Sequence, residues 1–221
     1  MAVSCRGGRF RSPEAPSAAY HREMTTQDWV GPVTLVGPRV RLEPLDEHHL
    51  EDLARVAFDD AIWRWTIAGP QDDAGLRRWV EQALASARSG TEVPFATVDA
   101  ATGRAIGSSR YLSIAPEHRR LEIGWTWVGV AFQRTGANRA AKRLQLAHGF
   151  ETLGAHRVEF KTHARNAASR AALLGIGATF EGVLRRHMVM PDGSARDSAY
   201  YSIVAAEWPA VRARLDASGA R

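Results

Sequence analysis

The sequence indicates one mixed α+β domain, and three observations lead to this prediction. Segments that alternate like strands are interleaved with segments that carry apolar residues at helical spacing. Three strand-like segments follow one another across short turns, as in an antiparallel meander. Farther along, one long helix stands between two strands, which predicts a right-handed crossover and one parallel strand pair. The expected architecture is a mixed central sheet of about six to seven strands with flanking helices.

Composition and charge fit a globular protein. The chain has 221 residues, of which 45% are hydrophobic and 24% charged, enough for a single sizeable core. No apolar run approaches the roughly 20 residues that a membrane span needs. The net charge of +5 fits a polyanionic partner such as nucleic acid, a ribosome or a phosphate-rich cofactor, and equally fits simple solubility. The single cysteine, Cys5, excludes an intramolecular disulfide and predicts a reducing, cytoplasmic compartment.

The N-terminal segment differs from the rest of the chain. Residues 1–23 show no hydrophobic period and are rich in Arg, Ser, Gly, Pro and Ala. They contain no secretory signal. We therefore expect residues 1–30 to form a disordered extension and residues 31–221 to form one domain. Met24 is a second candidate for the first residue of the native protein.

The first ordered elements are a strand and two helices. Val40 to Leu45 alternates like a strand, and Asp46 can cap the helical segment that follows. Residues 62–70 read as a turn or short helix that ends in a Gly-Pro breaker. From Asp73 an apolar stripe at helical spacing predicts a second helix, which Gly90 ends.

The remaining elements follow in order along the chain. Three meander strands precede the long helix, and a strand, a short helix, a hairpin and a closing helix come after it. The ranges are 94–100, 105–115 and 119–130 for the meander, 131–154 for the long helix, 155–163 for the next strand, 164–177 for the short helix, 181–190 and 195–204 for the hairpin, and 207–217 for the last helix.

The start of the long helix, AFQRTGANRAAKRL from Ala131, has the character of an anion site. A helix N-terminus offers unpaired N–H groups and the positive end of the helix dipole. Gly136 and Ala137 permit close approach to the backbone, and Thr135 and Asn138 can add hydrogen bonds. Basic residues surround them: Arg134, Arg139, Lys142 and Arg143. The spacing fits neither a P-loop nor a dinucleotide fingerprint, and an ordinary helix start with a polar cap is the alternative.

The pattern Gln133, Gly136 and Asn138 resembles motif A of the GNAT superfamily of N-acetyltransferases, Q/R-x-x-G-x-G/A. EIGWTW before it resembles the fourth strand of that family. HRVEFKTHARNAASRAALLGIGATFEGVLRRH after it resembles the fifth strand, the Asn-bearing turn, the short helix and the sixth strand. The resemblance spans residues 40–208 and is greatest to the RimJ/RimL-like branch. It departs from the pattern at Asn138, where the family has Gly or Ala.

The resemblance implies a GNAT-like fold in which two parallel strands splay apart near Trp127 and Val128. The pantetheine arm of acetyl-CoA would pair with the backbone there, and its diphosphate would rest on the amides that begin the long helix. Asn166 would hold the pantetheine from the other side. The implied cofactor-binding residues are Trp127, Val128, Gln133, Arg134, Thr135, Gly136, Ala137, Asn138, Arg139 and Asn166.

Catalytic candidates are fewer. Glu122, in an otherwise apolar strand, is the first candidate for the base that deprotonates the amine, and His187 is the second. A carboxylate paired with Arg119 or Arg120 is the alternative for Glu122, and a structural histidine for His187. The family often has a proton-donating Tyr seven residues after the Asn of the turn, but Leu173 stands there, and Ser169 is the substitute that the RimL-like enzymes suggest. Asp197 and Tyr200 could line the acceptor pocket, or Asp197 could pair across the hairpin.

The leading functional hypothesis is an acetyl-CoA-dependent N-acetyltransferase that acts on a primary amine, either a protein N-terminus or a small amine, by direct attack in a ternary complex. Antibiotic or polyamine acetylation is a narrower reading. A non-catalytic acyl-CoA sensor or scaffold and a basic RNA- or ribosome-binding module are the alternatives. The histidines, including His48 and His49, are not expected to cluster with carboxylates at metal-ligand spacing, so no metal is expected. DNA and membrane partners are not expected, and a homodimer remains open.

Overall fold

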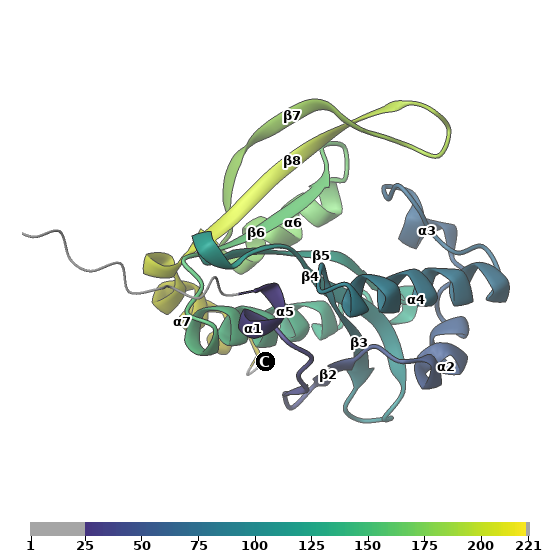
Figure 1. Ribbon diagram of the computed structural model, residues 1–221, viewed down its shortest axis with the longest axis horizontal. Coiled ribbons are helices and arrows are strands. Elements are labelled where there is room, and N and C mark those ends of the chain that lie inside the picture. Colours follow the sequence, from purple (N-terminus) through teal and green to yellow (C-terminus); the bar gives the residue numbers. More distant parts are fainter. Residues whose placement is uncertain (1–24, 220–221) are drawn as a thin grey trace, which may run out of the picture.

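An eight-stranded mixed sheet forms the centre of the computed structural model, which describes residues 25–219 (Figure 1). The strands lie side by side in the order β1-β2-β3-β4-β5-β6-β8-β7. Every neighbouring pair is antiparallel except β5 and β6, which are parallel. The mixed α+β prediction, with its meander and its one crossover, is confirmed. The strand bounds are Leu35–Val36 (β1), Val40–Pro44 (β2), Val93–Asp99 (β3), Ala105–Ala115 (β4), Arg120–Val128 (β5), Arg157–His163 (β6), Thr179–Val189 (β7) and Ala195–Val204 (β8).

Helices cover both faces of this sheet. Phe95 and Ala96 are neighbours on β3 but belong to different apolar clusters, because successive strand residues point to opposite faces. One cluster contains residues of α5, α6 and α7, and the other contains residues of α2, α3 and α4. None of the helices within residues 25–219 is long and apolar enough to cross a bilayer. The helix bounds are Thr26–Trp29 (α1), Leu50–Ala54 (α2), Asp60–Trp63 (α3), Asp73–Arg88 (α4), Ala137–Ala147 (α5), Ala167–Ile176 (α6) and Trp208–Gly219 (α7).

The first described residues belong to the folded domain. Trp29 and Val30 are buried, and the indole Nε1 of Trp29 donates to the Leu153 carbonyl oxygen at 2.9 Å. The prediction of disorder is therefore wrong for residues 25–30, because two apolar side chains at the end of a polar segment join the core. The rest of the predicted extension, residues 1–24, lies outside the described residues. The sheet has eight strands rather than six to seven because β1, with two residues, is too short to show alternation.

The two parallel strands separate soon after they begin. β5 pairs with β6 through three residue pairs, the last of which joins Glu122 to Glu159. Beyond this point β5 continues beside β4, and β6 continues beside β8. A wedge therefore opens between the two strands. The expected splay is confirmed, but it starts at Glu122 rather than near Trp127 and Val128.

A β-bulge accompanies this separation. Between Ser108 and Arg110 the register of β4 against β5 shifts, so that Trp125 and Thr126 both oppose Ser109. Trp125 has a φ of 49°, which a residue with a side chain rarely adopts. Because β5 has one extra residue at the bulge, the alternation of its side chains between the two faces is shifted by one residue after this point, beside the wedge.

β7 lies at one edge of the sheet, and its hairpin with β8 extends past the body of the domain (Figure 1). Most of its side chains are exposed. Asp197 of β8 accepts a hydrogen bond from the Arg186 N–H at 2.6 Å, so it does pair across the hairpin. Arg186 itself has a φ of 50°. The exposed large apolar residues of β7 are Phe180, Val183, Leu184 and Val189.

Candidate functional site

The first turn of α5 offers backbone donors that have few partners among residues 25–219. Gly136 occupies the N-cap with a φ of 91°, which glycine adopts without strain, and it has no side chain that could cap the helix. Arg134, Thr135 and Gly136 are exposed. The Thr135 hydroxyl donates to the Phe132 carbonyl oxygen at 2.8 Å, and the Ala137 N–H reaches that hydroxyl only at 3.4 Å. The helix start is therefore open to an anion.

Arg39, which sequence reasoning did not select, lies over this helix start. Its Nη1 donates to the Thr135 carbonyl oxygen at 3.0 Å, and its Nε would lie 3.5 Å from a Cβ built on Gly136. Arg39 is exposed and stands 96 residues before Thr135 in the sequence. The packing of α5 against β2 brings the two together, so no local motif could reveal it. A guanidinium at this place can pair with a phosphate.

The other side chains predicted to hold the cofactor have different partners around the same turn. Gln133 Nε2 donates to the Val128 carbonyl oxygen at 3.4 Å and so links the loop to the end of β5. Arg139 Nη2 donates to the Arg214 carbonyl oxygen of α7 at 3.5 Å. The amide oxygen of Asn138 is buried and has no hydrogen-bond partner within residues 25–219. The exposed backbone, rather than these side chains, is the most available part of the turn.

Trp127 and Val128 form the end of β5 beside the wedge. The Trp127 ring is buried, with its centroid 5.1 Å from that of Trp63 and 6.0 Å from that of Trp79, so the side chain belongs to the core. A Cβ on Gly107 of β4 would lie 2.2 Å from the Trp127 carbonyl oxygen, which shows how closely the two backbones approach. Only the backbone edge that faces β6 can therefore meet a ligand.

Asn166 and Ser169 lie across the wedge, at the start of α6. Asn166 is the N-cap residue, and its Oδ1 accepts a hydrogen bond from the Ser169 N–H at 3.0 Å. Leu173, at the position of the family's Tyr, is buried in the core. Within the described part of the chain, the Ser169 hydroxyl makes no hydrogen bond to Glu122 or His187. Asn166 therefore has a structural role in capping α6, and the role of Ser169 stays a prediction.

Glu122 is buried at the last residue pair of the parallel strands. The residue is 3% exposed, and its Oε2 lies 3.4 Å from Lys161 Nζ. The ion pair with Arg119 or Arg120 that the sequence left open is not formed: Arg120 pairs with Glu159 at 3.5 Å, and Lys161 takes its place beside Glu122. Burial raises the pKa of Glu122 above its usual value, although Lys161 and a hydrogen bond from Ser113 oppose this effect. A carboxylate of this kind is suited to accept a proton.

His187 and Tyr200 lie near Lys161 on the same face of the sheet. His187 Nδ1 lies 3.1 Å from Ser198 Oγ, and its ring centroid lies 5.7 Å from that of Tyr200. Lys161 Nζ lies 5.9 Å from the Tyr200 ring centroid. Burial, followed by the positive charges of Lys161 and Arg196, lowers the pKa of His187, which favours its neutral form. The structure thus brings two of the three predicted catalytic residues, Glu122 and His187, to one face.

His163 and Trp65 extend this face, and sequence reasoning missed both. His163 ends β6 and is buried, and its ring centroid lies 4.8 Å from that of Trp65, which follows α3. Its Nδ1 accepts the Arg165 N–H at 3.0 Å, so its proton resides on Nε2. The Trp65 carbonyl oxygen accepts a hydrogen bond from Arg196 Nη1 of β8 at 3.5 Å. No spacing in the sequence relates these three segments.

Lys142 is turned inward rather than placed on the rim of the anion site. It is buried against the β-bulge, where its Nζ donates to Thr126 Oγ1 at 2.5 Å and to Ser109 Oγ at 3.3 Å. No carboxylate of residues 25–219 lies within ion-pairing distance of it. Burial lowers the pKa of Lys142 to about 7, although the charge of Glu122 opposes this effect. A buried lysine next to the wedge is a feature that the motif did not predict.

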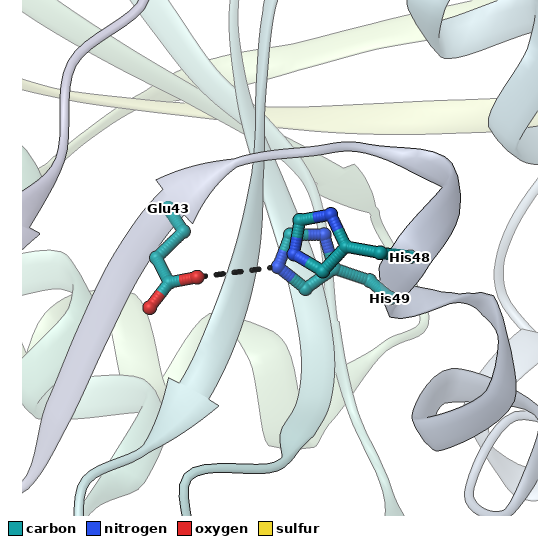
Figure 2. Close-up of side chains that lie close together, drawn as sticks. All are labelled: Glu43, His48 and His49. Carbon is teal, nitrogen blue, oxygen red and sulfur yellow. Dashed lines mark hydrogen bonds and ion pairs between the residues drawn. The ribbon is translucent and has the colours of Figure 1, made fainter.

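Three potential metal ligands gather at the end of β2. Figure 2 shows Glu43, His48 and His49, whose ligand atoms lie within 4.8 Å of one another. The prediction that these histidines do not lie with a carboxylate is therefore wrong, because a tight turn capped by Asp46 folds them back. His49 Nδ1 accepts the Asp46 N–H at 3.1 Å, and Glu43 accepts from Arg41 Nε at 2.8 Å. Hydrogen bonds at a helix start thus account for the cluster.

Comparisons with known proteins agree with this arrangement. A sequence model for a family described as an acetyltransferase (GNAT) domain matches residues 39–179. An uncharacterized N-acetyltransferase of Bacillus subtilis (strain 168), YoaA, is 33% identical over 103 residues, which are 47% of this chain and 57% of that protein. The match therefore spans little more than half the length of this curated relative.

Solved structures are similar over most of the chain. A GCN5-related N-acetyltransferase from Brucella melitensis is 30% identical with a TM-score of 0.79, and the match covers 86% of each chain. RimJ of Mycobacterium smegmatis, solved in complex with CoA-disulfide, is 26% identical with a TM-score of 0.72 and covers 85% of this chain and 95% of its own.

Proposed function

Because the chain belongs to the family of acetyltransferase (GNAT) domains, we propose that it transfers the acetyl group of acetyl-CoA to a primary amine by direct attack in a ternary complex. Acetyl transfer is the activity of this family, and the protein is an acyltransferase. The acceptor is a protein N-terminus or a small amine.

The observation that carries the proposal is the open start of α5 beside the wedge between β5 and β6. Gly136 presents backbone N–H groups without a side-chain cap, and Arg39 adds a positive charge to the same place. A diphosphate needs this combination of donors and charge. The wedge that begins at Glu122 then offers unpaired strand edges to the amides of the pantetheine arm, as an added strand would. Trp127, Val128 and Asn166 remain the residues that we assign to that arm.

Glu122 is the residue that we assign as general base. The amine must lose a proton before its nitrogen attacks the thioester carbonyl carbon. A C–N bond then forms and the C–S bond breaks, so that the thiolate of CoA leaves and takes up a proton. A buried carboxylate with a raised pKa can accept the proton of the amine near neutral pH. Ser169 and His187 are the side chains that we assign to the remaining proton transfers.

A second candidate function is that of an acyl-CoA sensor without catalysis. The buried Leu173 favours it, because no hydroxyl stands where the family often has its proton-donating Tyr. Such a protein would bind acetyl-CoA through the same α5 start. It would not accelerate acetyl transfer to any amine.

The test measures release of the CoA thiol from acetyl-CoA in the presence of a panel of N-terminal peptides, amino acids, polyamines and aminoglycosides. We expect at least one class of amine to raise the rate above hydrolysis, with the acetylated amine detected by mass spectrometry. Tight binding of acetyl-CoA with no amine-dependent release across the panel would favour the sensor. Absence of acetyl-CoA binding would exclude both.

A further inference from the structure

Arg196 is a buried cation that lacks an anionic partner. The residue is 6% exposed. Its Nε has no hydrogen-bond partner, and its Nη1 makes only a long hydrogen bond, 3.5 Å, to the Trp65 carbonyl oxygen. No carboxylate between residues 25 and 219 lies within ion-pairing distance of it. A buried guanidinium in this state is costly, because it has lost its water without gaining a counter-charge.

Arg110, the other buried arginine among the described residues, shows the usual arrangement. It is 4% exposed, but its Nη1 lies 2.7 Å from Glu92 Oε2, and its guanidinium stacks over the ring of Trp79 at 4.5 Å. The same fold therefore supplies a carboxylate for one buried arginine and none for the other. The difference points to a partner for Arg196 from outside the chain.

The surroundings of Arg196 also favour an added anion. Its positive charge contributes to lowering the pKa of His163 and of His187, so both histidines lie within its field. Glu122 is the nearby carboxylate of the site, but its Oε2 is held by Lys161 at 3.4 Å. The charge of Glu122 is thus met by Lys161, and Arg196 forms no ion pair within the described residues.

Arg196 lies on the side of the sheet where the proposed base lies. It is on β8, its neighbour on the same face is Ser198, and its contact with Trp65 links β8 to the segment after α3. In Figure 1 the β7–β8 hairpin extends toward the side of the domain where α3 lies. On the same face, Tyr200 of β8 pairs with Lys161 of β6, whose Nζ lies 3.4 Å from Glu122 Oε2. The charge of Glu122 also acts on Arg196. An acceptor whose amine reaches Glu122 can therefore also reach Arg196.

We propose that Arg196 binds a carboxylate of the acceptor, so that the substrate is an amine that also carries a carboxylate. This inference rests on the proposed acetyl transfer to an amine. The carboxylate belongs either to a free amino acid or to a peptide with an acidic residue near its N-terminus. In both cases it forms a charge-assisted, bidentate pair with the guanidinium. It supplies the counter-charge that the protein lacks.

The first experiment compares matched acceptors with the wild-type protein. Two sets of acceptors are used. The first set pairs a free amino acid with its carboxamide. The second set pairs a dipeptide or tripeptide that has Asp or Glu near its N-terminus with the same peptide carrying Asn or Gln. We expect kcat/KM to be at least about 10-fold higher for the carboxylate member of one set. Which set shows the difference identifies the source of the carboxylate. Equal rates for both members of every set that reacts would overturn the proposal.

The second experiment asks whether Arg196 is the residue responsible. Arg196→Gln should lower kcat/KM for the carboxylate acceptor by about 100-fold and leave the carboxamide nearly unchanged, mainly through KM. Arg196→Lys should recover part of the preference because it keeps the charge. Arg165→Gln, at an exposed arginine whose guanidinium lies 5.7 Å from the Trp65 ring centroid, is the matched control and should keep the preference. An Arg196→Gln protein that retains the full carboxylate preference contradicts the assignment.

A binding measurement separates this inference from the proposed function. Calorimetry in the presence of CoA measures binding of the N-acetylated amino acid or peptide and of its amide, neither of which needs turnover. Carboxylate-selective binding that Arg196→Gln abolishes supports the inference even if no acceptor is acetylated, in which case the proposed function alone fails. If acceptors are acetylated but neither rates nor binding depend on a carboxylate, the inference fails and the function stands. Affinity for CoA should be the same in every folded variant.

Discussion

Glu122 owes its chemical character to its position where the sheet stops pairing. Its neighbours in β5, Leu121 and Ile123, point into the core with α5, so Glu122 points to the opposite face. There it is buried and has Lys161 as its only basic partner within ion-pairing distance among the described residues. A carboxyl group of this kind can be ionised near neutral pH, and its raised pKa makes it a better acceptor for the proton of the attacking amine.

Replacement of Glu122 by Gln should lower kcat by about 10²–10⁴-fold, the usual contribution of a general base. The wild-type kcat/KM should rise with pH through an apparent pKa above that of an ordinary Glu, because burial raises the pKa of this group and the base acts only when ionised. The measurement is a pH–rate profile of both proteins. Glu159→Gln, at the register partner of Glu122, is the control: it should keep the acidic limb at a somewhat lower apparent pKa, because the charge of Glu159 contributes to raising the pKa of Glu122. A variant with full activity and an unchanged profile would remove Glu122 from the mechanism.

The burial of Lys142 predicts how the stability of the protein depends on pH. Its pKa of about 7 in the folded protein lies below its value in the unfolded chain, since burial disfavours the charged form. Between pH 7 and about 10 the unfolded chain therefore binds more protons, and the free energy of unfolding should increase with pH by a few kcal/mol. Lys142→Met should remove this rise and be more stable than wild type at pH 7. Urea titrations at several pH values measure it.

The control for that experiment is Gln145→Met, which changes a neutral side chain in the same buried polar group. It should keep the increase of stability with pH. If wild-type stability is flat between pH 7 and 10, Lys142 does not titrate in this range.

Single residues were the least predictable feature of this site. Glu122, Gly136 and Asn166 stand in contiguous motifs, and the structure places them at the wedge, the helix start and the α6 cap. Arg39 and Arg196 could not be recognised from the sequence. The role of Arg39 depends on the distant helix that packs beside it, and the role of Arg196 depends on the absence of a carboxylate within ion-pairing distance in the described part of the chain. Lys142 was misplaced because a helical position next to a motif does not reveal whether it faces the sheet or the solvent.

The start of α5 depends on a contribution from another element. Arg39 precedes β2, and it reaches the helix start because α5 packs across that strand. The proposed anion site thus combines a backbone turn and a guanidinium that come from distant parts of the chain. A substitution that reverses this charge tests the site without altering the helix.

Arg39→Glu should weaken binding of CoA by about 10-fold or more, because the new carboxylate faces the place proposed for the diphosphate. Gly136 is a poorer target, since any side chain would be strained at its φ of 91°. Arg78→Glu, at an exposed position of α4, causes the same change in net charge and should bind CoA as wild type does. Calorimetry at low and moderate salt is the measurement. Equal affinities for the two variants would place the diphosphate elsewhere.

Most elements could be predicted because their local signals agree with one another. Capping residues and apolar periods defined α4, the meander and the β7–β8 hairpin. β1 was missed because two residues carry no period, and α1 because its burial comes from contact with Leu153, far along the chain. The splay of β5 from β6 was expected only from family resemblance. The bulge that accompanies it depends on pairing with β4, which the sequence of β5 alone does not contain.

The whole domain should gain stability when CoA binds, because the ligand binds the folded state only. A concentration of 100 times Kd adds about 2.7 kcal/mol to the free energy of unfolding. For a domain of this length that corresponds to a rise in Tm of about 5–10 °C. Thermal melts with CoA, acetyl-CoA and ATP measure it, and ATP should give a smaller shift. A chelator should leave the shift unchanged, because no metal is expected at the site; loss of the shift on chelation would contradict that expectation.

The uncovered outer strand has a consequence for how the molecules behave when crowded. β7 combines four exposed apolar side chains with a row of peptide groups that a neighbouring molecule could extend into a continuous sheet. Arg185 and Arg186 lie in the middle of that row, and the positive φ of Arg186 breaks its flatness. Two like-charged, twisted edges repel each other and cannot align. The charge of Arg185 and Arg186, together with this break in flatness, should therefore keep two molecules from joining edge to edge into fibres.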